Sequence, residues 1–322
     1  MKVSVQLFAS RREGEAPAGV IEKTMELTQL ADELAFDAVW FAEHHGTPWN
    51  LCTDPLTLAA YAAGVTRSIG LGTAVSNLTV QHPVAVAERG ALVAQLSGGR
   101  LQLGIGRGFA ASDLALFGVP KDSAAQVFDR NLEQFGTHAT QLLPDRQGLW
   151  LATTGNPATL QFAADHGWGL LLAGSGGRLT DIGSQSRLLW QAQHAGQQPI
   201  AVFRAVHVAD TVEQARAEML PYVTWYRDQA AALQPEQPVR PVDEVLAGFC
   251  VFGPPEVCLQ ELTSLAQTAG ATEVVGVFGL GAAPLEMTRQ SMRRFAAEVK
   301  PLLAEVDTVA APMGAINDRP GS

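Results

Sequence analysis

The sequence predicts an α/β fold, a single-domain (β/α)₈ barrel, and three observations lead to this prediction. The 322 residues are 47% hydrophobic and only 17% charged, so the chain can bury a large core. Short β-rich runs alternate with helical patterns of about ten to twenty residues, which is the sequence form of repeated βα units and a parallel sheet. No long linker separates the units, which favours a closed barrel over an open doubly wound sheet.

Eight β-strands are expected from these runs. In chain order they cover residues 3–8, 38–42, 69–75, 101–105, 149–153, 169–173, 200–208 and 273–278. Segments between them, such as residues 19–35 and 84–96, carry apolar residues three and four positions apart. These segments should form the outer helices.

Two segments depart from the regular pattern. Residues 222–248 contain Gln-Pro-Glu-Gln-Pro and Arg-Pro, and they predict an irregular excursion before the last βα unit, long enough for a mobile lid. Residues 310–322 are rich in Gly, Pro and polar residues without periodicity. They predict a flexible C-terminal tail after a barrel domain of residues 1–309.

Charge and composition argue against several classes of function. The net charge is −10 and the basic residues are scattered singly or in pairs, so nucleic acid is not an expected partner. The first residues lack the apolar run of a secretory signal, and no stretch is apolar for long enough to span a bilayer, so a cytoplasmic protein is expected. The three cysteines, Cys52, Cys250 and Cys258, have no metal-ligand spacing, and no metal is expected.

Barrel enzymes carry their reactive groups just after the carboxyl ends of strands, and the second strand ends in Glu43-His44-His45. Histidine transfers protons near neutral pH, and a neighbouring carboxylate can fix its tautomer. This motif is equally compatible with catalysis by His44 and Glu43 and with a purely structural hydrogen bond at the barrel rim. A His-His metal pair is disfavoured because adjacent strand residues point to opposite faces.

The third and fourth strands end in small residues. Gly72-Thr73-Ala74-Val75 lets the backbone approach a flat ligand, or only relieves crowding inside the barrel. Gly104-Ile105-Gly106-Arg107-Gly108 fails the dinucleotide fingerprint, because the glycines fall as GxGxG and no helix follows promptly. Arg107 suits bidentate capture of a phosphate or carboxylate, or equally a surface ion pair. Asp113 in the same loop could face whatever Arg107 holds.

The fifth strand leads into Gly155-Asn156-Pro157-Ala158-Thr159. Asn156 suits a helix N-cap and Pro157 the first helical position, so a helix with free N–H groups should begin here. Such an end can bind a phosphate, but many capped helices bind none. A phosphate site here therefore requires Arg107 at the same place.

Together these strand ends resemble the bacterial luciferase-like family of flavin monooxygenases. The matching residues are Trp40…Glu43-His44-His45, Leu71-Gly72-Thr73-Ala74-Val75, His82-Pro83…Ala87-Glu88 and Leu96-Ser97-Gly98-Gly99-Arg100-Leu101…Gly104-Ile105-Gly106-Arg107-Gly108. The similarity is strong over residues 1–120 and continues more weakly to the end. It implies a (β/α)₈ barrel that uses reduced FMN with oxygen.

Residue by residue, the resemblance implies that His44 is the catalytic acid or base beside the flavin, next to Glu43, with Asp113 matching an acidic residue near the flavin. A non-prolyl cis peptide beneath the isoalloxazine ring would fall at Ala74-Val75. Gly106 stands at the flavin where luciferase catalytic chains often carry a reactive cysteine, so no thiol role is transferred. The FMN phosphate would be held by Arg107 with Gly155, Asn156 and Thr159.

The implied activity is that of a two-component monooxygenase. FMNH₂ from a separate reductase would react with O₂ to give a flavin hydroperoxide, which the protein must shield from water until it oxygenates a small organic substrate. That substrate could be an aldehyde, a ketone, or an aromatic or polyketide-like compound. The family also implies a homodimer. Three alternatives stay open: an F420-dependent hydride-transfer oxidoreductase of the same superfamily, a non-catalytic flavin-binding subunit, and a barrel hydrolase with a metal at His44 and His45.

Overall fold

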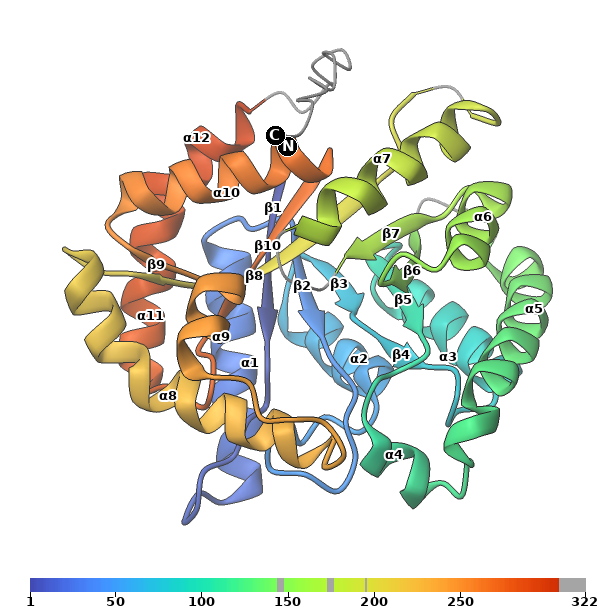
Figure 1. The fold of residues 1–322 in the computed structure, drawn as a ribbon, viewed down its shortest axis with the longest axis horizontal. Helices are drawn as coiled ribbons and strands as arrows, with labels where there is room; N and C mark the ends of the chain where they lie inside the picture. Colours follow the sequence, from blue (N-terminus) through green and yellow to red (C-terminus); the bar gives the residue numbers. More distant parts are fainter. Residues whose placement is uncertain (144–147, 173–176, 195, 307–322) are drawn as a thin grey trace, which may run out of the picture.

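The computed structural model describes residues 1–143, 148–172, 177–194 and 196–306 (Figure 1). Parallel strands form the barrel wall in the order β1 (Lys2–Leu7), β2 (Ala38–Phe41), β3 (Gly70–Thr73), β5 (Leu101–Gly106), β6 (Leu149–Thr153), β7 (Gly169–Leu172), β8 (Ile200–Val208) and β10 (Glu273–Phe278). Strand β10 pairs with both β1 and β8, because Glu273 lies in register with Lys2 and with Ala201. This double pairing closes the sheet, so the predicted (β/α)₈ barrel is confirmed.

The structure refines the predicted strand bounds. The strands at residues 149–153, 200–208 and 273–278 have the predicted limits, and most others differ by one residue at an end. The largest difference follows the third strand, where β3 ends at Thr73 and a two-residue strand β4 (Ser76–Asn77) pairs with Ile105 and Gly106 of β5. Residue 173, the predicted end of the sixth strand, lies outside the described residues.

Helices surround the barrel (Figure 1). They are α1 (Pro17–Glu33), α2 (Pro55–Val65), α3 (Pro83–Leu96), α4 (Ala111–Leu116), η1 (Lys121–Ser123), α5 (Ala124–Leu142), α6 (Pro157–His166), α7 (Gly177–Gln191), α10 (Pro255–Ala269), α11 (Leu285–Arg294), η3 (Phe295–Val299) and α12 (Lys300–Ala304). Helices α1, α2, α3, α6 and α10 begin with proline. Proline suits this position because its fixed φ matches the helix and its missing N–H would have no partner there.

The predicted excursion before the last βα unit is present. It is mostly helical, whereas an irregular segment was predicted. Residues 222–232 continue α8 (Val212–Ala232), and α9 (Val242–Phe249) follows it. The Pro-containing stretch between these helices, residues 233–241, is the part without regular structure. After α9, strand β9 (Cys250–Gly253) pairs with the second half of β8 outside the barrel closure. The predicted tail of residues 310–322 lies outside the described residues.

The barrel interior is filled by large side chains. Trp40 packs edge-on against Trp150 with ring centroids 5.5 Å apart, and against Phe203 at 6.3 Å. A Cβ atom on Gly72 would lie 2.2 Å from the Trp40 ring, so Gly72 makes room for that ring. Trp40 also donates its Nε1–H to the buried carboxylate of Glu273 at 3.0 Å. A packed interior leaves the open end of the barrel as the place for a ligand.

Candidate active site

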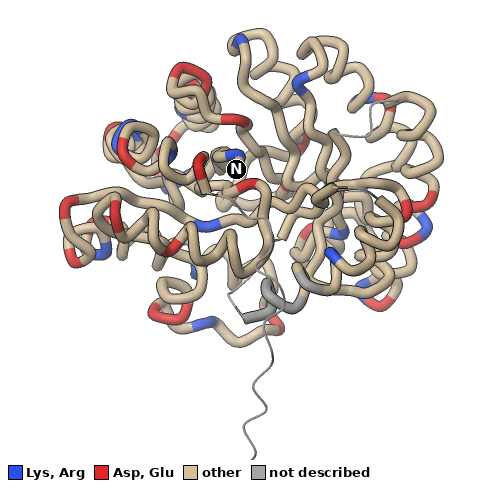
Figure 2. Tube along the Cα trace, turned by 90° about the horizontal axis from the view of Figure 1, so that it is seen from above, with Lys and Arg blue, Asp and Glu red and all other residues tan. Residues whose placement is uncertain are grey.

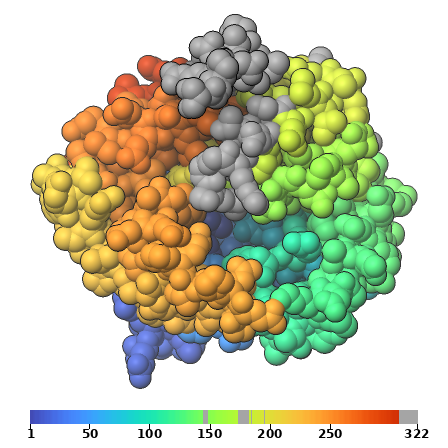
Figure 3. Space-filling view, viewed as in Figure 1, coloured from blue at the N-terminus to red at the C-terminus, as the bar shows by residue number. Residues whose placement is uncertain are grey.

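The predicted site residues meet at one end of the barrel. They follow the carboxyl ends of β2, β3, β5 and β6, which are consecutive parallel neighbours in the sheet. The space-filling view shows a hollow in the middle of one face, where blue and teal atoms of the early strands are visible between the orange and the green segments (Figure 3). The fold therefore brings chain segments that are far apart in sequence to a common site.

His44 is held by its backbone and by aromatic rings. Its side chain is 8% exposed, and its backbone N–H donates to the Cys52 carbonyl at 3.0 Å. The imidazole lies 4.5 Å from the Trp49 ring and 5.4 Å from the Phe109 ring, centroid to centroid. Its Nδ1 is buried without a hydrogen-bond partner, 3.6 Å from Oδ2 of Asp113. An unpaired buried imidazole nitrogen is costly without a ligand and is suited to proton transfer once one binds.

Glu43 contacts His45 and not His44, which corresponds to the structural hydrogen bond that the motif left open beside a catalytic pairing with His44. One carboxylate oxygen lies 2.8 Å from Nε2 of His45, and the other accepts the backbone N–H of Asn77 at 2.9 Å and an N–H of Gln81. The hydrogen bond that the Glu43 carboxylate accepts from His45 raises the pKa of the His45 imidazole. Glu43 therefore ties the loops after β2 and β3 together.

Asp113 is the carboxylate that lies beside both histidines. Helix α4 places it with only 2% of the residue exposed. Its Oδ1 accepts the backbone N–H of His45 at 3.2 Å, while its Oδ2 faces Nδ1 of His44. Asp113 can therefore orient and stabilise a protonated His44, the role that the sequence suggested for Glu43.

Small residues and bare backbone form the surface beside these groups. The Ala74-Val75 peptide bond is cis, as predicted. A Cβ atom on Gly104 would lie 2.1 Å from the Thr73 carbonyl oxygen, and one on Gly106 would lie 3.0 Å from a methyl group of Val75. Only glycine lets β5 run this close to the loop after β3. This close packing leaves Ala74 and Val75, at the cis peptide bond, as partly exposed small side chains beside the site.

Among the residues that the structure describes, Arg107 makes no hydrogen bond or ion pair with the start of α6. The Arg107 side chain is exposed, and among the residues that the structure describes it has no ion-pair partner. Asn156 is the predicted N-cap of α6: its Oδ1 accepts the N–H groups of Ala158 and Thr159 at 2.9 and 3.3 Å. Gly155, with φ +99°, makes the turn into this helix. The predicted helix start is thus confirmed, and a phosphate contact at Arg107 or at this helix stays a prediction.

Several residues of the site were not singled out from the sequence. Trp49 and Phe109 enclose His44, and their rings lie 5.7 Å apart. The side-chain polar atoms of Trp49 and Ser76 are buried and have no partner. Trp49 lies in the loop after the His44-His45 motif, and Phe109 follows Gly108, but nothing in the local pattern shows that these loops meet.

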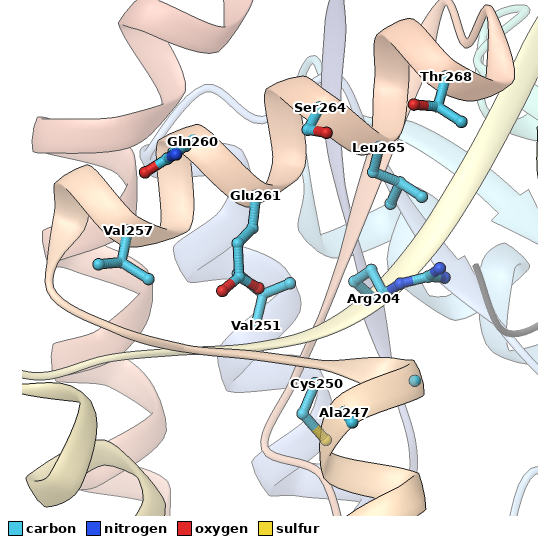
Figure 4. Close-up of a pocket in the computed structure, with 11 residues that line it drawn as sticks. Arg204, Ala247, Cys250, Val251, Val257, Gln260, Glu261, Ser264, Leu265 and Thr268 are labelled. Atoms are coloured by element: carbon cyan, nitrogen blue, oxygen red, sulfur yellow. The ribbon is translucent and has the colours of Figure 1, made fainter. Parts of the chain in front are cut away.

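Two cavities lie among the described residues, one beside the predicted site and one outside the barrel. One, of about 380 Å³, is lined by Arg107, Phe109 and Lys121 among others, and lies beside the site. The larger, of about 600 Å³, lies outside the barrel between α9, β9 and α10, with Arg204 and Glu261 in its wall (Figure 4). None of the predicted site residues lines the larger cavity, so its size does not make it the active site.

Other classes of site find no support in the described residues. No group of three His, Cys, Asp or Glu side chains among them is placed to hold a metal ion. Lys and Arg are scattered along the chain and interspersed with Asp and Glu (Figure 2). No helix in the described part of the chain has both the length and the apolar character needed to cross a membrane.

Comparison with known proteins identifies relatives over most of the chain. The 4-hydroxyprotoasukamycin monooxygenase of Streptomyces nodosus subsp. asukaensis is 29% identical over 345 residues, covering 94% of this chain and 92% of that protein. Among solved structures, the monooxygenase RslO1 from Streptomyces bottropensis has a TM-score of 0.82 at 22% identity, covering 94% of this chain and 99% of that one.

Two further structures share the fold and were solved with different cofactors. The oxygenating constituent of 3,6-diketocamphane monooxygenase from Pseudomonas putida, in complex with FMN, has a TM-score of 0.72 at 18% identity, covering 94% and 99% of the two chains. An F420-dependent secondary alcohol dehydrogenase in complex with an F420-acetone adduct has a TM-score of 0.71 at 16% identity, with the same coverage. Both cofactors are therefore carried by barrels of this shape.

The family profile of the luciferase-like monooxygenases matches residues 1–273. This match covers most of the chain and includes every predicted site residue, on a closed barrel that the solved relatives share. The protein belongs to the luciferase-like monooxygenase family.

Proposed function

We propose that the protein is a monooxygenase that uses reduced FMN and O₂ to oxygenate a small organic substrate, with FMNH₂ supplied by a separate flavin reductase. Family membership supports an oxidoreductase, and the similarity to 4-hydroxyprotoasukamycin monooxygenase over 94% of this chain supports a monooxygenase. The observation that carries the proposal is the pair of buried side chains His44 and Asp113, at the same end of the barrel as the partly exposed cis peptide bond Ala74-Val75.

The residues present fit a flavin. A flat ring needs a surface with few bulky side chains, and the partly exposed Ala74 and Val75 at the cis peptide bond offer one. Buried polar atoms of His44, Trp49 and Ser76 lack partners, and a heteroaromatic ring with polar edges could satisfy them. Bound there, reduced FMN would supply the electrons that activate O₂.

The protein's own residues have defined tasks in this proposal. His44 moves a proton at its imidazole, and Asp113 stabilises the protonated form. Glu43 is a positioning residue, because it holds His45 and the Asn77 backbone. Arg107 holds the FMN phosphate, and the start of α6 at Gly155, Asn156 and Thr159 is a second candidate for this contact. Trp49 and Phe109 exclude water from His44.

Rapid mixing tests this function. The protein with FMNH₂ should be mixed with oxygenated buffer, and the absorbance followed between the spectra of reduced and oxidised flavin. A transient species that outlasts the one seen with free FMNH₂ supports oxygen activation. His44→Ala should bind FMN with nearly unchanged affinity but slow oxygenation about 10²- to 10⁴-fold. Immediate reoxidation without a transient species contradicts the proposal.

A second candidate is an F420-dependent oxidoreductase, which the similar fold of the F420-dependent alcohol dehydrogenase favours. Equilibrium binding of FMN and F420 to the same preparation separates the two. Tight F420 binding with weak FMN binding selects hydride transfer. FMN binding without turnover of any substrate selects a non-catalytic flavin-binding subunit.

We further propose that the protein is a homodimer. Sedimentation measures its mass in solution and tests this proposal.

A further inference from the structure

The cavity of about 380 Å³ beside the site has walls from three parts of the chain. They are the loop after β5, the α4–α5 region, and the stretch between α8 and α9. Phe109 connects the cavity to the proposed catalytic group, because it lines the cavity and its ring also contacts His44. A ligand group bound here would lie next to the reaction site.

Two cationic side chains, Arg107 and Lys121, line this cavity. Arg107 has no ion-pair partner among the described residues. Lys121 pairs with the carboxylate of Glu236, whose side chain is 69% exposed, while that of Lys121 is 63% exposed. An exposed pair of this kind contributes little free energy, so a ligand anion can replace Glu236 at small cost.

The position of Glu236 lets it leave without unfolding its segment. Leu233, three residues earlier, is 3% exposed, and its carbonyl accepts the backbone N–H of Ala111 at 2.9 Å. Leu233 also packs in a cluster with Trp49 and Ala110. The backbone is therefore anchored against α4, and rotation of the Glu236 side chain is enough to free Lys121.

We propose that Lys121 is a second cationic contact for a phosphate monoester beside Arg107, and that Glu236 competes with this phosphate for Lys121. The inference rests on the proposed function, in which the phosphate belongs to FMN. A phosphate monoester carries a charge near −2 at neutral pH, so two cations match it better than one. Arginine binds two phosphate oxygens with its planar fork, and lysine adds a point charge.

Binding of FMN and riboflavin tests the subsite, because the two differ only by the phosphate. Dissociation constants are measured by quenching of oxidised-flavin fluorescence, without turnover. Lys121→Gln should weaken FMN binding about tenfold and leave riboflavin binding unchanged, since one charge-assisted contact to phosphate is lost. Glu236→Gln should tighten FMN binding severalfold, again without an effect on riboflavin. Both differences should shrink in 1 M salt, where the Debye length falls to about 3 Å.

The pair Lys23 and Glu15 supplies matched controls, because it joins the same residue types across 4.0 Å elsewhere in the chain. Lys23→Gln and Glu15→Gln should leave the FMN-to-riboflavin affinity ratio unchanged. An unchanged ratio in both Lys121→Gln and Glu236→Gln overturns the inference while FMN binding by the wild type still supports the proposed function. A wild type that binds neither flavin overturns both.

A phosphate on the substrate would offer the same chemistry as the phosphate of FMN. Titration of the FMN-loaded wild type with inorganic phosphate separates these sources. If the phosphate of FMN occupies the subsite, added inorganic phosphate should not bind near Lys121 in the FMN-loaded protein. Inorganic phosphate should also compete with the binding of FMN but not with the binding of riboflavin. Lys121-dependent phosphate binding to the FMN-loaded protein would assign the subsite to the substrate and overturn the FMN assignment.

Discussion

Replacement of Glu43 by glutamine should destabilise the protein more at low pH than at high pH. Glu43 is 5% exposed and its carboxylate accepts hydrogen bonds from His45, from the Asn77 backbone at 2.9 Å and from Gln81. A buried hydrogen bond to a charged group contributes about 1.5 to 3 kcal/mol. Glutamine keeps one acceptor oxygen, so at pH 5.5 we expect the free energy of unfolding to fall by about 2 kcal/mol or more.

The pH dependence follows from the raised pKa of His45, for which the Glu43 hydrogen bond is the main cause. A group whose pKa is raised by folding contributes stability that is complete below its unfolded value, about 6.5 for histidine. This contribution disappears as the pH rises through the raised pKa of the folded state. Above the raised pKa His45 is neutral and can accept an N–H from the glutamine, so the deficit should be smaller at pH 9 than at pH 5.5, about 1 kcal/mol.

Urea unfolding followed by circular dichroism at pH 5.5 and pH 9 measures this difference. Glu26→Gln is the matched control, because Glu26 forms an exposed ion pair with Arg289 at 2.8 Å and should change stability by less than about 0.5 kcal/mol. An equal deficit for Glu43→Gln at both pH values would refute the charged His45–Glu43 pair. A stable variant with lost flavin affinity would instead indicate that Glu43 touches the cofactor.

Three further predictions concern the barrel and its rim. Burial raises the pKa of Glu273, so the stability contributed by its protonated form is lost as the pH rises from about 4.3 through the raised value. The Tm of Glu273→Gln should therefore increase relative to that of the wild type between pH 5 and pH 8. A constant difference in Tm would contradict this. Gly104→Ala would place a Cβ 2.1 Å from the Thr73 carbonyl oxygen, and should lower stability by about 1 to 3 kcal/mol in urea unfolding, whereas an unchanged midpoint would show that β5 can move. Asn156→Ala removes the cap of α6 and should cost about 1 kcal/mol, while a much larger loss of FMN than of riboflavin affinity would add a direct phosphate contact.

Local patterns were sufficient to predict the strands, because β-rich runs and turn residues leave a period in the sequence. Three of the strands have the predicted bounds, and the N-cap at Asn156 and the cis peptide bond at Ala74-Val75 are confirmed. The excursion was misread because its prolines and glutamines are concentrated in residues 233–241, and they obscured the helices on both sides.

The sequence by itself determined the barrel and the family, since periodicity and motifs are local properties of the chain. The tertiary structure decided which of the candidate site residues meet. It paired Glu43 with His45, brought Asp113 to His44 across 3.6 Å, and set Lys121 beside Arg107 in one cavity. The spacing of residues along the chain does not specify the distance between loops that follow different strands. Those distances are fixed only when the closed sheet sets each loop against its neighbours.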